Sequence, residues 1–124
     1  MNDKRPVNLD IGSISLPITA WVSLMHRASG VFLFAGIALL IYMLDESLTS
    51  QESFVTLKES LASPGAKFAV WFVMAGMIYH TVAGIKHLIM DFGFGETMEG
   101  GVLGARLTIA ISVVLSILAG VWIW

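Results

Sequence analysis

The sequence predicts an all-α integral membrane protein with three transmembrane helices, and three observations support that prediction. Hydrophobic residues make up 56% of the 124-residue chain. Charged residues make up only 13%, about half their share in an ordinary soluble domain. The apolar residues also gather into runs such as 28–44 and 107–124, which contain no charged side chain. A helix needs ~20 apolar residues to cross a bilayer, so the chain fits three crossings with short connections.

The chain is expected to form one membrane domain, 1–124, with a polar segment before the first crossing. Residues 1–17 are interrupted by Pro6 and Pro17 and lack the apolar core of a signal peptide. We therefore expect this segment to be irregular or to lie on the membrane surface. The predicted spans cover residues 18–47, 66–92 and 103–124.

Polar and glycine-rich stretches separate the predicted spans. The first connection, 45–64, carries several acidic residues and has room for a short amphipathic helix at 53–61. Gly93 and Gly95 are expected to end the second span, because glycine after an apolar helical run is a common helix stop. Residues 96–104 are then predicted to form a short acidic loop.

The distribution of positive charge predicts the orientation of the chain. Cytoplasmic loops of membrane proteins carry an excess of lysine and arginine. Five such residues lie on the side of the N-terminus and the second loop: Lys4, Arg5, Arg27, Lys86 and Arg106. The opposite side carries only Lys58 and Lys67. We therefore expect the N-terminal segment and the second loop in the cytoplasm, and the C-terminus outside.

The second span carries the main candidate functional residue, His80. An ionisable side chain inside a membrane span is energetically costly and by default marks a functional site. Gly76, His80, Gly84 and His87 are spaced by four, four and three residues, so they share one helix face. Glycines one turn to either side of an imidazole leave room for a flat ligand. The pattern predicts haem packed on Gly76 and Gly84, with His80 as an axial ligand of its iron. A second interpretation stays open, in which His80 only hydrogen-bonds to a neighbouring helix.

The first span carries a second group of polar residues. Ser23, His26, Arg27 and Gly30 are separated by three or four residues and therefore share a helix face. Arg27 precedes seventeen uncharged residues and could be a snorkelling side chain that anchors the helix end. It could instead bind an anion or a carbonyl oxygen, with Ser23 as a second donor. Haem propionates and a quinone carbonyl both need donors at the membrane edge, which favours a functional role.

Other residues narrow the hypotheses about the site. The chain has no cysteine, so it holds no iron–sulfur cluster through thiolates and any haem is bound non-covalently through histidine. His87 and Asp91 lie four residues apart near the cytoplasmic end of the span, and their roles stay open. A small transporter that relays protons through His80 is a weaker hypothesis, because the chain has no acidic residue at a similar depth.

Three motifs resemble one known family. They are Arg5-Pro6-Val7-Asn8-Leu9-Asp10, Ser23-x-x-His26-Arg27-x-Ser29-Gly30, and Tyr79-His80-x6-His87-x3-Asp91-Phe92-Gly93. Together with three spans in the same order, they resemble the bacterial succinate dehydrogenase cytochrome b membrane-anchor subunit over most of the chain. Lys86 departs from the family pattern, in which we expect arginine. Lysine keeps the charge but loses the planar fork, which puts a bidentate propionate contact there in doubt.

The resemblance implies a complex of four different chains in the bacterial inner membrane. A flavoprotein subunit oxidises succinate and an iron–sulfur subunit carries electrons. Two membrane anchors hold haem b and form the site where ubiquinone is reduced, so the succinate chemistry belongs to another chain. His80 matches the haem ligand of this subunit, and the second anchor supplies the other axial histidine. Ser23 and Arg27 match quinone-site positions, while His26 and Arg27 match positions near the haem propionates.

The partners expected from this resemblance are the second anchor, the iron–sulfur and flavoprotein subunits, and membrane lipid, with no nucleic acid. The main alternative is a haem-free structural anchor or assembly protein, in which His80 serves only to join helices.

Overall fold

The computed structural model describes residues 7, 10, 12 and 14–124. These residues form helices and turns, with no strand among them. The helices in chain order are α1 (Ile18–Thr49), α2 (Gln51–Ser60), α3 (Pro64–Asp91) and α4 (Met98–Ile123). Three of them, α1, α3 and α4, are long and apolar enough to cross a membrane. The predicted all-α fold is therefore confirmed. The motif that begins at Arg5 lies outside the described residues, except for Val7 and Asp10.

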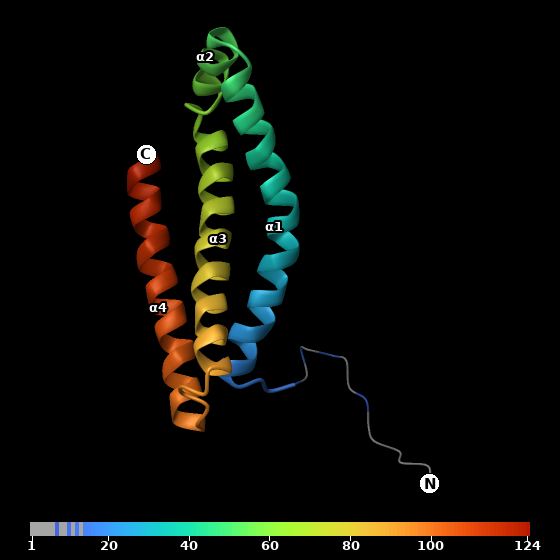
Figure 1. Cartoon of the computed structure of the whole chain (residues 1–124), viewed down its shortest axis with the longest axis vertical. Helices are drawn as coiled ribbons and strands as arrows, with labels where there is room; N and C mark the ends of the chain where they lie inside the picture. The colour runs from blue at the N-terminus through green and yellow to red at the C-terminus, as the bar shows by residue number, and fades with distance from the viewer. Residues whose placement is uncertain (1–6, 8–9, 11, 13) are drawn as a thin grey trace.

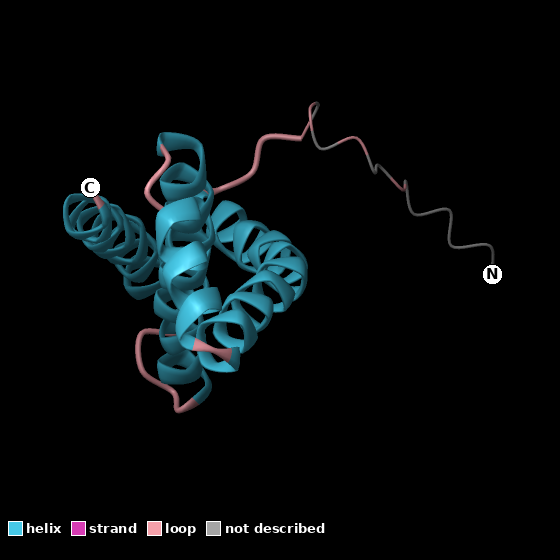
Figure 2. Cartoon of the chain, turned by 90° about the horizontal axis from the view of Figure 1, so that it is seen from above, coloured by secondary structure: helices cyan, strands magenta, loops and turns pink. Residues whose placement is uncertain are grey.

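Helix α3 lies between α1 and α4 and packs against both (Figures 1 and 2). The start of α1 and the α3–α4 turn lie at one end of the molecule, and α2 lies at the other (Figure 1). Small and branched apolar side chains fill the contacts between the helices: Val22, Leu33, Val73, Ala83 and Ala105 are buried. This arrangement brings the two polar sequence motifs, one on α1 and one on α3, to the same end of the molecule.

Charged residues bracket an apolar section of similar length on two of the long helices. At ~1.5 Å of rise per residue, Arg27 and Asp45 of α1 are about 27 Å apart along the axis. Lys67 and Lys86 of α3 are about 28 Å apart by the same measure. Both intervals match the ~30 Å thickness of the hydrocarbon core. Because α1 has 32 residues, its ends extend beyond that section on both sides.

Helix α4 begins at Met98, so the predicted loop at 96–104 is wrong from residue 98 onward. The Thr97 side chain caps the helix by accepting a 3.0 Å hydrogen bond from the backbone N–H of Gly100. A Cβ on Gly100 would lie 2.9 Å from the Cα of Gly95, so glycine lets the turn and the helix meet closely. The cap and this close packing offset the low helix propensity of glycine.

The turns around these helices follow their local sequence. Gly93 and Gly95 have φ values of +90° and +70°, which agrees with their predicted role in ending the second span. Helix α2 covers most of the predicted amphipathic segment and begins two residues before it. Ser50 and Ser53 form a reciprocal capping box at its start, and Ser53 also donates a 2.7 Å hydrogen bond to the carbonyl of Glu46. This bond fixes α2 to the end of α1.

Most of the apolar surface of the long helices faces outward. Within the most apolar stretch of each, only 11% of residues in α1 and α3 and 17% in α4 are buried inside the chain. Phe34, for example, is 86% exposed. Such a surface is stable only against lipid or against helices of other chains.

Candidate functional site

All three histidines of the chain come together between α1 and α3. The ring of His26 stacks on that of His80, with centroids 4.3 Å apart and planes inclined by 16°. The same ring lies 5.2 Å from that of His87, with the planes at 47°. The helical spacing of residues predicted that His80 and His87 share a face of α3. It did not predict that His26 of α1 contacts both, because that contact depends on how the two helices pack.

His80 is held through one of its two ring nitrogens. Its Nδ1 lies 2.9 Å from the hydroxyl oxygen of Ser29 and 3.2 Å from the carbonyl oxygen of His26. Its Nε2 makes no hydrogen bond to the described part of the chain. A Cβ on Gly30 would lie 3.2 Å from Cε1 of His80, so the imidazole rests directly against the backbone of α1.

The contact of Ser29 with His80 is not predicted by the sequence. Ser29 lies within the Ser23–Gly30 motif, but a single hydroxyl inside an apolar helix is a common packing residue. One sequence feature could have indicated this contact: Ser29 directly precedes Gly30, so α1 has two adjacent small residues there. Only the packing of the two helices shows that both contact the ring of His80.

The two glycines predicted to pack against haem are covered by side chains of α1 in this structure. A Cβ on Gly76 would lie 2.7 Å from the ring of Phe32, and one on Gly84 would lie 3.5 Å from Nε2 of His26. Both glycines therefore give close approach to the face of α3 that carries His80. Their role in packing haem stays a prediction.

The four residues of α1 that were predicted to share one helix face divide into two pairs. His26 and Gly30 face α3 and contact His80. Arg27 is exposed and Ser23 is half-buried, and neither side chain makes a hydrogen bond or ion pair to the described residues. Within the described part of the chain, the guanidinium and the hydroxyl are therefore available as donors.

The polar end of α3 contains Lys86, His87 and Asp91. The charges of Lys86, Asp91 and Arg27 all lie close enough to act on the ring of His87. Asp91 is exposed and forms no hydrogen bond with His87 among the described contacts. The stem of Lys86 packs on Gly104 of α4, where an added Cβ would lie 3.5 Å from Cε of the lysine.

Other polar side chains join the helices. The hydroxyl of Tyr79 donates a 2.7 Å hydrogen bond to the carbonyl of Val22 in α1. The indole N–H of Trp71 donates a 2.8 Å hydrogen bond to the carbonyl of Ser116 in α4, and a Cβ on Gly120 would lie 3.1 Å from that nitrogen. The second contact seats the indole against the small residue Gly120, so the two long helices approach closely there.

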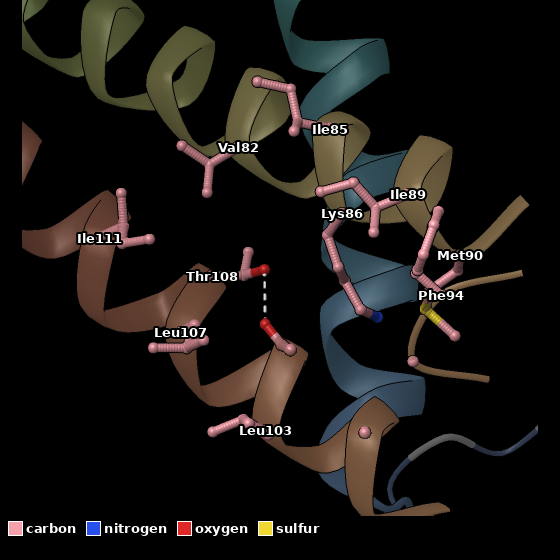
Figure 3. A pocket seen from close by; sticks show the side chains of 13 residues that line it. Val82, Ile85, Lys86, Ile89, Met90, Phe94, Leu103, Leu107, Thr108 and Ile111 are labelled. Carbon is pink, nitrogen blue, oxygen red and sulfur yellow. Dashed lines mark hydrogen bonds between the residues drawn. The ribbon is translucent and has the colours of Figure 1, made fainter. Parts of the chain in front are cut away.

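A cavity of about 380 Å³ lies between α3, the following turn and α4 (Figure 3). Its walls are apolar apart from Lys86 and Thr108, and the hydroxyl of Thr108 donates to the carbonyl of Gly104 at 2.8 Å. None of its lining residues comes from α1. The cavity is therefore separate from the donors Ser23 and Arg27.

The fold and this site define a class: a helical membrane protein that crosses the bilayer three times and gathers its imidazoles between the first two crossings. The family model for the succinate dehydrogenase/fumarate reductase transmembrane subunit matches residues 1–119. The chain belongs to this family. The resemblance found in the sequence motifs is thereby confirmed, as is the function of a membrane subunit of succinate dehydrogenase.

Individual relatives agree with the family assignment. The chain is 42% identical to the succinate dehydrogenase cytochrome b556 subunit of Coxiella burnetii over 100% of both chains. It is 32% identical to the cytochrome b556 subunit of Paracoccus denitrificans, over 92% of this chain and 88% of that one. It is 33% identical to the mitochondrial cytochrome b560 subunit of Homo sapiens, over 94% and 72% of the two chains.

Proposed function

We propose that this chain, with a second membrane anchor, binds haem b and helps form the site where ubiquinone is reduced. The two anchors hold a flavoprotein subunit and an iron–sulfur subunit at the cytoplasmic face of the bacterial inner membrane. Electrons from succinate reach the quinone through the complex. The residues of this chain bind, orient and donate hydrogen bonds, while the redox chemistry belongs to the cofactors.

The environment of His80 is the observation that carries the haem proposal. A histidine that binds a metal through one ring nitrogen commonly uses the other in a hydrogen bond that fixes the ring. Nδ1 of His80 has two oxygen neighbours and Nε2 has no hydrogen bond in the described structure. The described residues form no group of three or more side chains suited to a bare metal ion. Haem needs only axial ligands from protein, so one histidine from each of two chains suffices.

The exposed apolar surface supports the need for a second anchor. A haem held here would take His80 as one protein ligand and would need a second one. His26 and His87 are the only other histidines of the chain. Both lie on the polar side of His80, beside the charges of Arg27 and Lys86. A partner helix that covers the outward surface of α1 and α3 would bring the second imidazole to the depth of His80.

Ser23 and Arg27 support the quinone proposal. Both are hydrogen-bond donors without a partner among the described residues, and they are four residues apart on α1. Donors fixed beside a quinone carbonyl favour the negative charge that develops on its oxygen during reduction. Arg27 also lies at the polar edge of the apolar section of α1. There the side chains of His26 and Arg27 can donate hydrogen bonds to haem propionates.

Two variants test the two parts of the proposal in the purified complex. His80→Ala should abolish the b-type absorption of the complex, whereas an unchanged spectrum would rule out the ligand role.

Arg27→Ala should lower quinone reduction by succinate while electron transfer from succinate to an artificial acceptor stays intact. An equal loss of both activities would point to failed assembly and not to a quinone contact.

A further inference from the structure

We propose that Ser29 is a positioning residue for the haem ligand: its hydroxyl oxygen accepts the Nδ1 proton of His80 and so fixes the tautomer that leaves Nε2 free for iron. This inference rests on the proposed role of His80. Ser29 itself does not touch the cofactor in this scheme, and it acts only through the imidazole.

The proton of Ser29 is already committed to another acceptor. A serine hydroxyl has one proton to donate. The Ser29 oxygen lies 2.7 Å from the carbonyl oxygen of His26, three residues earlier in α1, and donates to it. The 2.9 Å contact between Ser29 and Nδ1 of His80 must then take its proton from the imidazole. Nδ1 therefore carries the hydrogen.

The carbonyl of His26 selects the same tautomer. It lies 3.2 Å from Nδ1 and has no proton, so an unprotonated Nδ1 would face it lone pair to lone pair. The carbonyl also accepts from Ser29 at 2.7 Å and from the α-helical N–H four residues later. With two lone pairs already used, it can offer Nδ1 only a weaker, shared contact. The shorter contact to Ser29 is thus the main acceptor for the imidazole proton.

The consequence lies on the other side of the ring. A neutral imidazole with its proton on Nδ1 has its lone pair on Nε2. A hydrogen bond from Nδ1 to a fixed acceptor sets the orientation of the ring plane and raises the electron density at Nε2. The loss of such a hydrogen bond typically lowers metal affinity about 10–100-fold. Removing the Ser29 hydroxyl should therefore loosen haem binding. It should also raise the haem midpoint potential, because a weaker donor stabilises ferric iron less.

The test compares four variants in the whole complex purified from membranes. Ser29→Ala removes the main acceptor and leaves Nδ1 only the 3.2 Å contact with the carbonyl of His26, and Ser29→Thr keeps the hydroxyl. Ser29→Val has the shape of the threonine variant without its hydroxyl. Ser47→Ala is the matched control, because Ser47 also lies in α1 and donates a 2.7 Å hydrogen bond to the carbonyl three residues earlier, but it contacts no histidine. Haem affinity is measured by transfer of haem to excess apomyoglobin, and the midpoint potential by redox titration of the b-type absorption.

We expect Ser29→Ala and Ser29→Val to weaken haem binding about tenfold and to shift the potential to more positive values. Ser29→Thr and Ser47→Ala should match the unmodified complex. If threonine and valine behave alike, or if all Ser29 variants match the unmodified complex, the positioning role is wrong while the ligand role of His80 stands. If His80→Ala keeps an unchanged b-type spectrum, the proposed function itself fails and the role of Ser29 fails with it.

Discussion

Substituting Gly30 by alanine should weaken haem binding through the position of the His80 ring. The new Cβ would lie 3.2 Å from Cε1 of that ring, whereas non-bonded carbon atoms are most stable at about 3.5–4.0 Å. The ring must therefore withdraw from α1 by about 0.3–0.8 Å, or the helices must separate by that amount.

Such a shift is large enough to weaken the contact that fixes the ring. The Ser29 oxygen and Nδ1 of His80 are 2.9 Å apart. A displacement of ~0.5 Å along that line lengthens the contact to about 3.4 Å, beyond the usual limit of ~3.2 Å for N–H···O hydrogen bonds. We expect Gly30→Ala to reduce haem affinity about tenfold, which is the low end of the effect of losing such a contact. Overpacking should also lower stability by ~1–3 kcal/mol.

Gly36→Ala is the matched control for this prediction. Its Cβ would lie 3.0 Å from Cγ1 of Val73, a tighter contact on the same α1–α3 interface, but six residues from Gly30 and away from the histidines. It should cost as much stability as Gly30→Ala while haem affinity and midpoint potential stay unchanged. Thermal unfolding of the purified complex and haem transfer to apomyoglobin separate the two effects. Equal haem affinities in the two variants would refute the reasoning.

Three further substitutions test other parts of the structure. Arg27→Lys should keep the charge but lower the rate of quinone reduction, because lysine lacks the planar fork of donors; succinate oxidation with an artificial acceptor is the control. Tyr79→Phe removes the 2.7 Å hydrogen bond to Val22 and should destabilise the complex by ~0.6–1.7 kcal/mol in thermal unfolding, with haem absorption unchanged. Thr97→Ala removes the cap on Gly100 and should cost ~0.5–2 kcal/mol, measured as faster hydrogen exchange at the start of α4.

The sequence was sufficient to predict the membrane fold because the membrane constrains it so strongly. Every backbone N–H and C=O in hydrocarbon must be paired, so long uncharged runs can only be helices in this chain. The start of α4 was missed because glycines at 100, 101 and 104 lower the local helix propensity. What offsets them is the Thr97 cap and the close contact of Gly100 with Gly95, and the second of these depends on tertiary packing.

The candidate site was predictable only within each helix. The four-residue spacing places His80 between Gly76 and Gly84 on one face of α3, because helix geometry fixes which residues share a face. Contacts between α1 and α3 depend on the axial register and rotation of two helices, which no spacing within one helix determines. The stacking of His26 on His80 and the hydrogen bond between Ser29 and His80 are contacts of this second kind.

The interface between α1 and α3 changes in character along its length, and this change bears on how the site is held. At one end it is polar and contains the His26, Ser29 and His80 contacts. At the other end Leu33 is buried and Gly36 packs tightly on Val73. Lipid tails are as apolar as these side chains, so close packing and not burial from water holds membrane helices together.

The close-packed end therefore fixes the register of the two helices, and Nδ1 of His80 depends on that register for its contacts of 2.9 Å and 3.2 Å with α1. A helix shift of one residue moves a side chain by ~1.5 Å along the axis and by about 100° around it, which would separate Ser29 from His80. Tight contacts such as Gly36–Val73 make such a shift costly. The apolar half of the interface thus opposes slippage by a whole residue, whereas a small local adjustment around Gly36, as in Gly36→Ala, leaves that register and the position of the candidate ligand unchanged.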